Sequence, residues 1–102
     1  MNIPAENRKT PRSAVLRINS KRLNLANSAQ VSQEGEDLIA AGATELVVDC
    51  STVTMVDSSG IGTLVGLRKK IGEGGNIVLR SPQPFVRKVL HLTKTDTLFE
   101  IR

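Results

Sequence analysis

The sequence has 102 residues, of which 39% are hydrophobic and 24% are charged, and this balance is typical of one soluble globular domain. No stretch approaches the roughly 18 consecutive apolar residues of a membrane span, and the amino terminus lacks the apolar segment of a secretory signal. The single cysteine, Cys50, excludes an internal disulfide. We therefore expect a cytoplasmic protein with no membrane span.

The net charge of +4 is unevenly distributed along the chain. Residues 24–67 contain six acidic residues and no Lys or Arg, whereas both flanking segments are basic. We therefore expect an acidic surface around the middle of the chain. The chain has two Phe and neither Trp nor Tyr, so it lacks the aromatic platform on which bases stack. Direct nucleic-acid recognition is not expected.

Residues 1–12 are polar, include two prolines and show no periodicity, which predicts a flexible arm ahead of a single domain over residues 13–102. Hydrophobic periodicity then predicts alternating elements in the order strand, helix, strand, helix, strand, helix, strand. The expected segments are residues 14–18, 28–41, 45–50, 58–71, 76–80, 82–92 and 98–101. This alternation is typical of an α/β fold whose strands are joined by helical crossovers.

The apolar pattern also predicts which side chains are buried. In the connection before the second helix, Val53 and Met55 are expected to pack against the core. The last helix is expected to direct its apolar residues inward, namely Phe85, Val86, Val89, Leu90 and Leu92. Gly62, in the first turn of the second helix, is expected to allow that helix to pack closely against the sheet.

No arrangement of residues typical of an enzyme is present. The sequence has no glycine- and lysine-containing phosphate loop, and its only histidine, His91, lies in the apolar pattern of the last helix, where we expect a structural role. Cys50, at the end of a strand, is expected to be a small core residue. Asp49 and Asp57 alone are too few ligands for a metal site. We expect neither catalysis nor a cofactor.

The segment Asp57-Ser58-Ser59-Gly60 opens the second helix. Asp57 or Ser58 can accept hydrogen bonds from the free backbone N–H groups there, which is ordinary helix capping. The same position leaves a hydroxyl group accessible to another protein's active site. A phosphate on it would carry a charge of about −1.5 to −2 beside the positive end of the helix dipole, which the fold can tolerate. From the residues alone, capping and a phosphorylation switch both remain open.

Several of these segments resemble the STAS domain of bacterial anti-sigma factor antagonists. The resemblance covers residues 44–101 in order, and residues 1–43 match only in outline. It is carried by residues 46–51, by the Asp57-Ser58-Ser59-Gly60 block, by the Gly74-Gly75 turn with the strand after it, and by residues 86–93. It implies a single α/β STAS domain, with a four- to five-stranded mixed sheet packed against three to four helices.

The resemblance further implies a protein without catalytic activity or a cofactor of its own. In the family, an anti-sigma factor that is also an ATP-dependent serine kinase phosphorylates the hydroxyl residue directly after the aspartate. That residue is Ser58 here, with Ser59 as the second candidate. The unphosphorylated form binds the kinase and releases the sigma factor, and a serine phosphatase reverses the modification. The implied partner surface comprises Asp57, Ser58, Ser59, Gly60, Ile61 and Asn24.

Two positions depart from the family pattern. Asn24 stands where an aspartate is usual, which predicts altered recognition by the kinase, and Lys94 replaces a glycine that usually follows the Leu-Thr pair. The motif is also compatible with a non-cycling STAS subunit of a lipid-transport ABC complex, and with a scaffold in a larger signalling assembly. The STAS domain of an anion transporter is disfavoured because no membrane segment precedes the domain.

Overall fold

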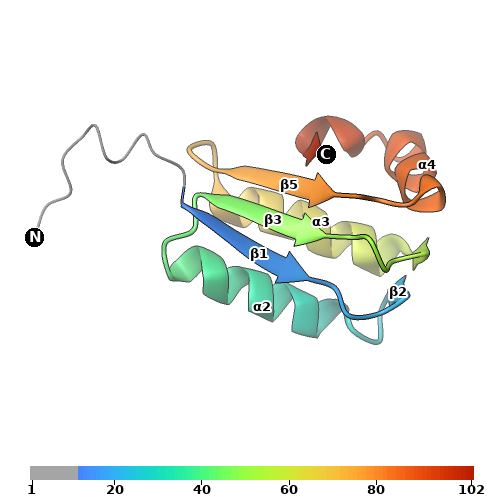
Figure 1. Ribbon diagram of the computed structural model, residues 1–102, viewed down its shortest axis with the longest axis horizontal. Helices are drawn as coiled ribbons and strands as arrows, with labels where there is room; N and C mark the ends of the chain where they lie inside the picture. The colour runs from blue at the N-terminus through green and yellow to red at the C-terminus, as the bar shows by residue number, and fades with distance from the viewer. Residues whose placement is uncertain (1–11) are drawn as a thin grey trace, which may run out of the picture.

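Four strands form the main sheet of the computed structural model, which describes residues 12–102 (Figure 1). The elements are β1 (Ser13–Arg17), β2 (Arg22–Leu23), α2 (Ser28–Ala40), β3 (Glu45–Asp49), β4 (Met55–Val56), α3 (Ser58–Ile71), β5 (Asn76–Arg80), α4 (Pro84–Leu92), the 3-10 helix η1 (Asp96–Leu98) and β6 (Glu100–Ile101). The α/β fold and its alternation of strands and helices are as the sequence predicts. The flexible arm expected over residues 1–12 lies, except for Arg12, outside the described residues.

The strand order in the main sheet is β1-β3-β5-β6, and every neighbouring pair is parallel. In register, Leu46 of β3 lies between Ala14 of β1 and Ile77 of β5. Over residues 12–102 the sheet therefore differs from the mixed sheet that the resemblance implies. Each strand is joined to the next by a connection that contains a helix, which returns the chain to the same end of the sheet.

The short strands β2 and β4 pair in parallel beyond the carboxyl ends of the main strands (Figure 1). Arg22 lies opposite Met55 and Leu23 lies opposite Val56. Leu23 and Val56 are buried, whereas the two outer residues are exposed. The expected burial of Met55 is therefore wrong, since this side chain is 50% exposed. Two residues are too few for alternation to reveal a strand in the sequence.

Helices α2 and α3 pack side by side against one face of the sheet (Figure 1). Helix α2 contacts β1 and β3, and α3 contacts β5. The central strands contribute Leu46, Val48, Ile77 and Leu79 to the core between these layers, and all four are 0% exposed. Burying an aliphatic side chain of this size stabilises the fold by roughly 1.5–3 kcal/mol. This core holds the carboxyl ends of the strands in place.

Two groups at the end of β3 belong to the structure of the sheet. The carboxylate of Asp49 contacts Arg17 at 3.4 Å and Arg80 at 3.3 Å. Hydrogen bonds from Ser51, supported by Arg80, lower the pKa of Asp49 from 3.8 to about 2. Cys50 is buried as expected, and burial raises the pKa of its thiol to about 12. At neutral pH the thiol is protonated and unreactive.

Helix α4 begins at Pro84, two residues later than the sequence predicts. Ser81 has a φ of 55°, in the left-handed region, so the helix cannot include it. The proline also keeps Gln83 in an extended conformation. The start of the helix is therefore set by the backbone on either side of Gln83 and not by the apolar pattern.

The apolar pattern of α4 is only partly buried. Val86 and Leu90 lie in the core, but Phe85 is 43% and Leu92 is 68% exposed, so the prediction that both point inward is wrong. The helix rests on the core through a narrow stripe, which leaves the neighbouring apolar positions in solvent. His91 is also exposed, and its Nδ1 lies 3.1 Å from a carboxylate oxygen of Asp96.

Lys94 follows α4 with a φ of 58°, in the left-handed region that favours glycine. We expect Lys94→Gly to raise the free energy of unfolding by about 0.5–1 kcal/mol, because the relief of backbone strain exceeds the added chain entropy of glycine. Urea denaturation measures the change. Lys94→Ala is the control, since it removes the same side chain and keeps the strain. Equal effects of the two substitutions would contradict this explanation.

Candidate functional site

The amino terminus of α3 lies at the carboxyl ends of the strands, near β2 (Figure 1). Asp57 is the N-cap residue: its backbone is extended, and its Oδ1 accepts a hydrogen bond of 2.9 Å from the Gly60 N–H. The expected capping of this helix is therefore confirmed, and Asp57 is the capping residue. The carboxylate satisfies one of the N–H groups that a helix start leaves without a partner.

The second carboxylate oxygen of Asp57 reaches a different part of the chain. Oδ2 accepts a hydrogen bond of 3.3 Å from the Leu25 N–H, and the Asp57 N–H donates to the Leu23 carbonyl at 3.2 Å. Both leucines lie in the segment between β1 and α2. Hydrogen bonds to an ionised group are roughly twice as strong as neutral ones. Asp57 therefore joins this segment firmly to the first turn of α3.

The loop formed by residues 22–27, here called the 22–27 loop, is shaped by two asparagines. Asn27 Oδ1 accepts from the Asn24 N–H at 3.0 Å, and Asn27 Nδ2 donates to the Arg22 carbonyl at 2.8 Å. Asn24 Oδ1 in turn accepts from the Ala26 N–H at 3.0 Å, which is a typical turn-forming contact. Asn27 is also the N-cap residue of α2, but its side chain makes no cap hydrogen bond because it is used by the loop.

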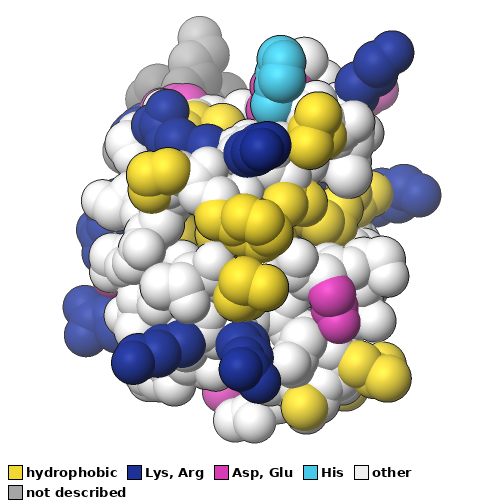
Figure 2. All heavy atoms as spheres, turned by 90° about the vertical axis from the view of Figure 1, so that its right-hand side faces the viewer, with side chains coloured by type: hydrophobic (Ala, Val, Ile, Leu, Met, Phe, Trp, Pro, Cys, Tyr) yellow, Lys and Arg dark blue, Asp and Glu magenta, His cyan; other side chains and the backbone are white. Residues whose placement is uncertain are grey.

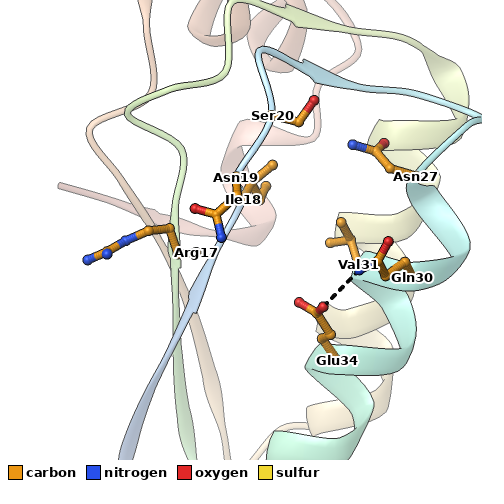
Figure 3. A pocket seen from close by; sticks show the side chains of 8 residues that line it. All are labelled: Arg17, Ile18, Asn19, Ser20, Asn27, Gln30, Val31 and Glu34. Carbon is orange, nitrogen blue, oxygen red and sulfur yellow. Dashed lines mark hydrogen bonds between the residues drawn. The ribbon is translucent and has the colours of Figure 1, made fainter.

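A cavity of about 250 Å³ lies between the end of β1 and the first turns of α2 (Figure 3). Asn27, just before α2, and Gln30 and Glu34 of α2 line it (Figure 3). Gln30 donates to Glu34 at 3.3 Å, and Asn27 is bonded to the 22–27 loop. These polar groups are thus engaged with the protein itself. Ser58 does not line this cavity, which we treat as separate from the site.

The two adjacent serines differ in their surroundings. Ser58 is exposed, whereas Ser59 is half-buried. Within residues 12–102 neither hydroxyl has a hydrogen-bond partner, and the Thr63 hydroxyl donates at 3.1 Å to the backbone carbonyl of Ser59. Of the two hydroxyl groups, that of Ser58 is the more accessible to another protein.

The two glycines of the first turn also differ. A Cβ on Gly60 would lie 2.4 Å from the Leu23 carbonyl oxygen and 2.7 Å from Cγ2 of Val56, whereas nothing lies within 4 Å of a Cβ on Gly62. Gly60 is therefore the residue that lets α3 approach β2 and β4. The expectation that Gly62 is closely packed is wrong, because sequence spacing does not show which glycine faces the small sheet.

The residues of the implied partner surface fall into two groups. Gly60 and Ile61 are buried and support the site from beneath. Asn24 and Asp57 lie at the surface, in the lining of a cavity of about 260 Å³, and Ser58 follows directly in the chain. The full lining of this cavity is Arg22, Asn24, Met55, Val56 and Asp57. Neither Arg22 nor Met55 is predicted as a site residue, because their pairing depends on the small sheet, which the sequence pattern does not reveal.

The surface around this site is not acidic, contrary to expectation. Figure 2 shows hydrophobic side chains across the middle of this face, with Lys and Arg side chains above and below them. Arg22 lines the same cavity as Asp57, although it lies outside the acidic stretch of residues 24–67. The prediction fails because the fold brings basic segments from elsewhere in the sequence next to the acidic one.

The chemistry available at the site is that of an exposed hydroxyl beside a carboxylate held by backbone N–H groups. Within residues 12–102, no three His, Cys, Asp or Glu side chains come close enough together to hold a metal ion. Over the same range, no helix has the length and the apolar character needed to cross a membrane.

The parallel α/β fold thus presents an exposed serine in the first turn of a capped helix. The chain matches the STAS domain over residues 4–102 and belongs to this family, so the resemblance seen in the sequence is confirmed at the level of the family. It is 34% identical over 70 residues to a STAS-domain-containing protein of Pseudomonas aeruginosa strain UCBPP-PA14, a match covering 68% of this chain and 69% of the relative.

Solved structures of similar proteins include a proposed anti-sigma factor antagonist of Thermotoga maritima. It is 29% identical, with a TM-score of 0.75 over 85% of this chain and 77% of that one. The Bacillus anti-sigma factor antagonist SpoIIAA shares the fold in its unphosphorylated form, with a TM-score of 0.75 and 24% identity over 91% of this chain and 82% of that one. The phosphorylated form of SpoIIAA gives a TM-score of 0.68 at 23% identity, covering 91% of this chain and 85% of that one.

The position of Gly60 against the small sheet can be tested by adding a methyl group. We expect Gly60→Ala to lower the free energy of unfolding by about 1–3 kcal/mol, because the Cβ would overlap the Leu23 carbonyl. Gly62→Ala is the matched control in the same turn. It is expected to raise the free energy of unfolding by about 0.5–1 kcal/mol, because alanine is the better helix former. Thermal denaturation followed by circular dichroism measures both, and a lowered midpoint for Gly62→Ala would argue against this assignment.

The connection made by Asp57 can be tested by removing one or both of its acceptors. We expect Asp57→Ala to lower the free energy of unfolding by about 1–2 kcal/mol and to speed amide hydrogen exchange at both Leu25 and Gly60. Asp57→Asn retains one acceptor oxygen for the cap and should speed exchange mainly at Leu25. Slow, unchanged exchange at Leu25 in Asp57→Ala would show that the carboxylate does not hold the 22–27 loop.

Proposed function

We propose that this chain is an anti-sigma factor antagonist in a phosphorylation-controlled partner switch, with Ser58 as the phosphorylated residue. The observation that carries the proposal is the exposed hydroxyl of Ser58 in the first turn of α3, directly after a capping residue, Asp57, whose two oxygens are both bound. The likeness to the proposed antagonist of Thermotoga maritima, at 29% identity over 85% of this chain, supports the role.

In the proposed cycle, the unphosphorylated chain binds an anti-sigma factor that is also a serine kinase, and the sigma factor is released in the cytoplasm. The kinase transfers the γ-phosphoryl group of ATP to Ser58 Oγ: the new O–P bond forms, the bond to ADP breaks and the hydroxyl proton leaves. ATP and Mg²⁺ belong to the kinase, so the chain needs neither a cofactor nor catalytic residues. A serine phosphatase restores the hydroxyl by hydrolysis of the phosphoester.

The start of α3 suits this modification. A phosphate on Ser58 would lie in the first helical turn, where the helix dipole favours negative charge and free N–H groups are available. Asp57 keeps the 22–27 loop and the helix start together, so a charge of about −1.5 to −2 would change the surface and leave the fold intact. Ser59 is the second candidate, but its partial burial makes it the poorer substrate.

The proposed partner contacts are made by the surface residues of the site. Asn24, Asp57, Ser58 and Ser59 would meet the kinase, with Gly60 and Ile61 shaping the site beneath them. The proposed bounds of the STAS domain within this sequence are residues 13–102.

Phosphate transfer by the cognate kinase tests the acceptor. We expect mass spectrometry to find one phosphate, on Ser58, after incubation with the kinase and ATP. Ser58→Ala should lose incorporation and keep kinase binding, while the matched variant Ser59→Ala should be phosphorylated as the wild type is. Ser58→Asp should bind the kinase more weakly than Ser58→Ala. Undiminished phosphorylation of Ser58→Ala would overturn the assignment.

Mapping Ser58 in the native cells tests the role as a whole. A phosphate on Ser58 that changes with growth conditions supports partner switching. A Ser58 that stays unmodified, in a chain that copurifies with a membrane ATPase, would identify the other role instead, that of a fixed subunit of a lipid-transport ABC complex.

A further inference from the structure

Three large hydrophobic side chains are exposed on elements that lie near Ser58. Leu25 is 76% exposed, Met55 50% and Phe85 43%. They belong to the 22–27 loop, to β4 and to α4, and α4 packs against β4. Figure 2 shows hydrophobic side chains gathered across this face. Such a gathering on the surface of a soluble domain is typical of a protein-binding site.

Basic side chains border this apolar surface. Arg22 lies directly opposite Met55 in the β2–β4 pair, and Lys21 precedes it. On α4, Lys88 lies three residues after Phe85 and therefore on the same side of the helix. All three cations are exposed. We refer to the following residues as the docking face: Lys21, Arg22, Leu25, Met55, Phe85 and Lys88.

The cations of the docking face are available to a partner. Within residues 12–102, Lys21, Arg22 and Lys88 form no salt bridge, whereas Arg17 and Arg80 are both paired with Asp49. The nearby carboxylate of Asp57 is occupied by backbone N–H groups. Asn24, which lines the same cavity as Arg22, is uncharged. The face therefore has free positive charge and little negative charge to offset it.

We propose that the docking face recognises an acidic surface with an apolar centre on the anti-sigma factor kinase, and that phosphorylation of Ser58 acts by cancelling the positive charge of this face. This inference rests on the proposed function, because it concerns the partner of the same site. Lys21, Arg22 and Lys88 together with Asp57 leave two net positive charges. A phosphate of about −1.5 to −2 nearly cancels them. Release of the kinase then needs no change in the fold.

Charge reversal on the docking face provides the test. We expect Arg22→Glu and Lys88→Glu each to weaken binding of the purified cognate kinase about tenfold or more, because each places a negative charge against an acidic surface. Lys70→Glu, an exposed position in the last turn of α3, is the matched control and should change the affinity less than about twofold. Binding of the wild-type chain should weaken as salt rises from about 0.05 to about 0.3 M.

A charge swap locates the interaction on the partner. In the kinase, an acidic residue of the interface changed to Lys should restore the binding of Arg22→Glu. The same kinase variant should bind Lys70→Glu as weakly as it binds the wild-type chain, because both keep Arg22. The melting midpoint of each variant, compared with that of the wild type, shows that the domain is folded. Kinase binding by the phosphorylated wild-type chain should depend on salt as weakly as kinase binding by Arg22→Glu does, because both have lost positive charge at this face.

The outcomes separate this inference from the proposed function. If the wild-type chain binds the kinase and is phosphorylated, but Arg22→Glu and Lys88→Glu bind equally well, the charge recognition is overturned and the partner switch stands. If the wild-type chain neither binds the kinase nor accepts phosphate, both are overturned. Binding of the wild-type chain to vesicles with about a third phosphatidylserine, lost in Arg22→Glu while kinase binding is unchanged, would assign the basic groups to a membrane surface and overturn the inference.

Discussion

The carboxylate of Asp57 joins two segments that lie more than 30 residues apart in the sequence. One oxygen caps α3 through the Gly60 N–H, and the other holds the 22–27 loop through the Leu25 N–H. A helix start with a single bond of this kind could shift relative to the loop. With both bonds, the hydroxyl of Ser58 has a defined position relative to Asn24 and the small sheet. The arrangement of the whole site depends on this one side chain.

The close approach of α3 to the small sheet is the second requirement, and Gly60 satisfies it. The Leu23 carbonyl occupies the space where a Cβ would lie, and the same carbonyl accepts the Asp57 N–H. Glycine and aspartate thus act on the same point of β2 from the same first turn of α3. The aspartate and the glycine at the two ends of this segment fix its backbone. Of the two serines between them, Ser58 is left exposed.

Much of the fold follows from sequence patterns. The three long strands and the helix from Ser58 to Ile71 are strongly periodic and lie where they are predicted. The strands β2 and β4 are missing from the prediction because two residues show no alternation. Hydrophobicity assigns Phe85 and Met55 to the core, but both side chains are exposed. A sequence pattern cannot show that the contact of their elements with the core is too narrow to bury these side chains. The charge at the site could not be predicted either, because Arg22 comes to line the same cavity as Asp57 only through the pairing of β2 with β4.

The same tertiary arrangement changes how a phosphate would act. On an acidic surface, a phosphate would add repulsion between this chain and a partner that already binds next to negative charge. On a surface with free cations, such as the proposed docking face, it would remove an attraction for an acidic partner. A fall in the net charge of this face from two positive charges to near zero lowers the affinity without any unfavourable contact. Each 1.4 kcal/mol of lost attraction corresponds to about a tenfold loss of binding affinity. The uncharged Asn24 contributes to this behaviour, since an aspartate there would already offset part of the positive charge before Ser58 is modified.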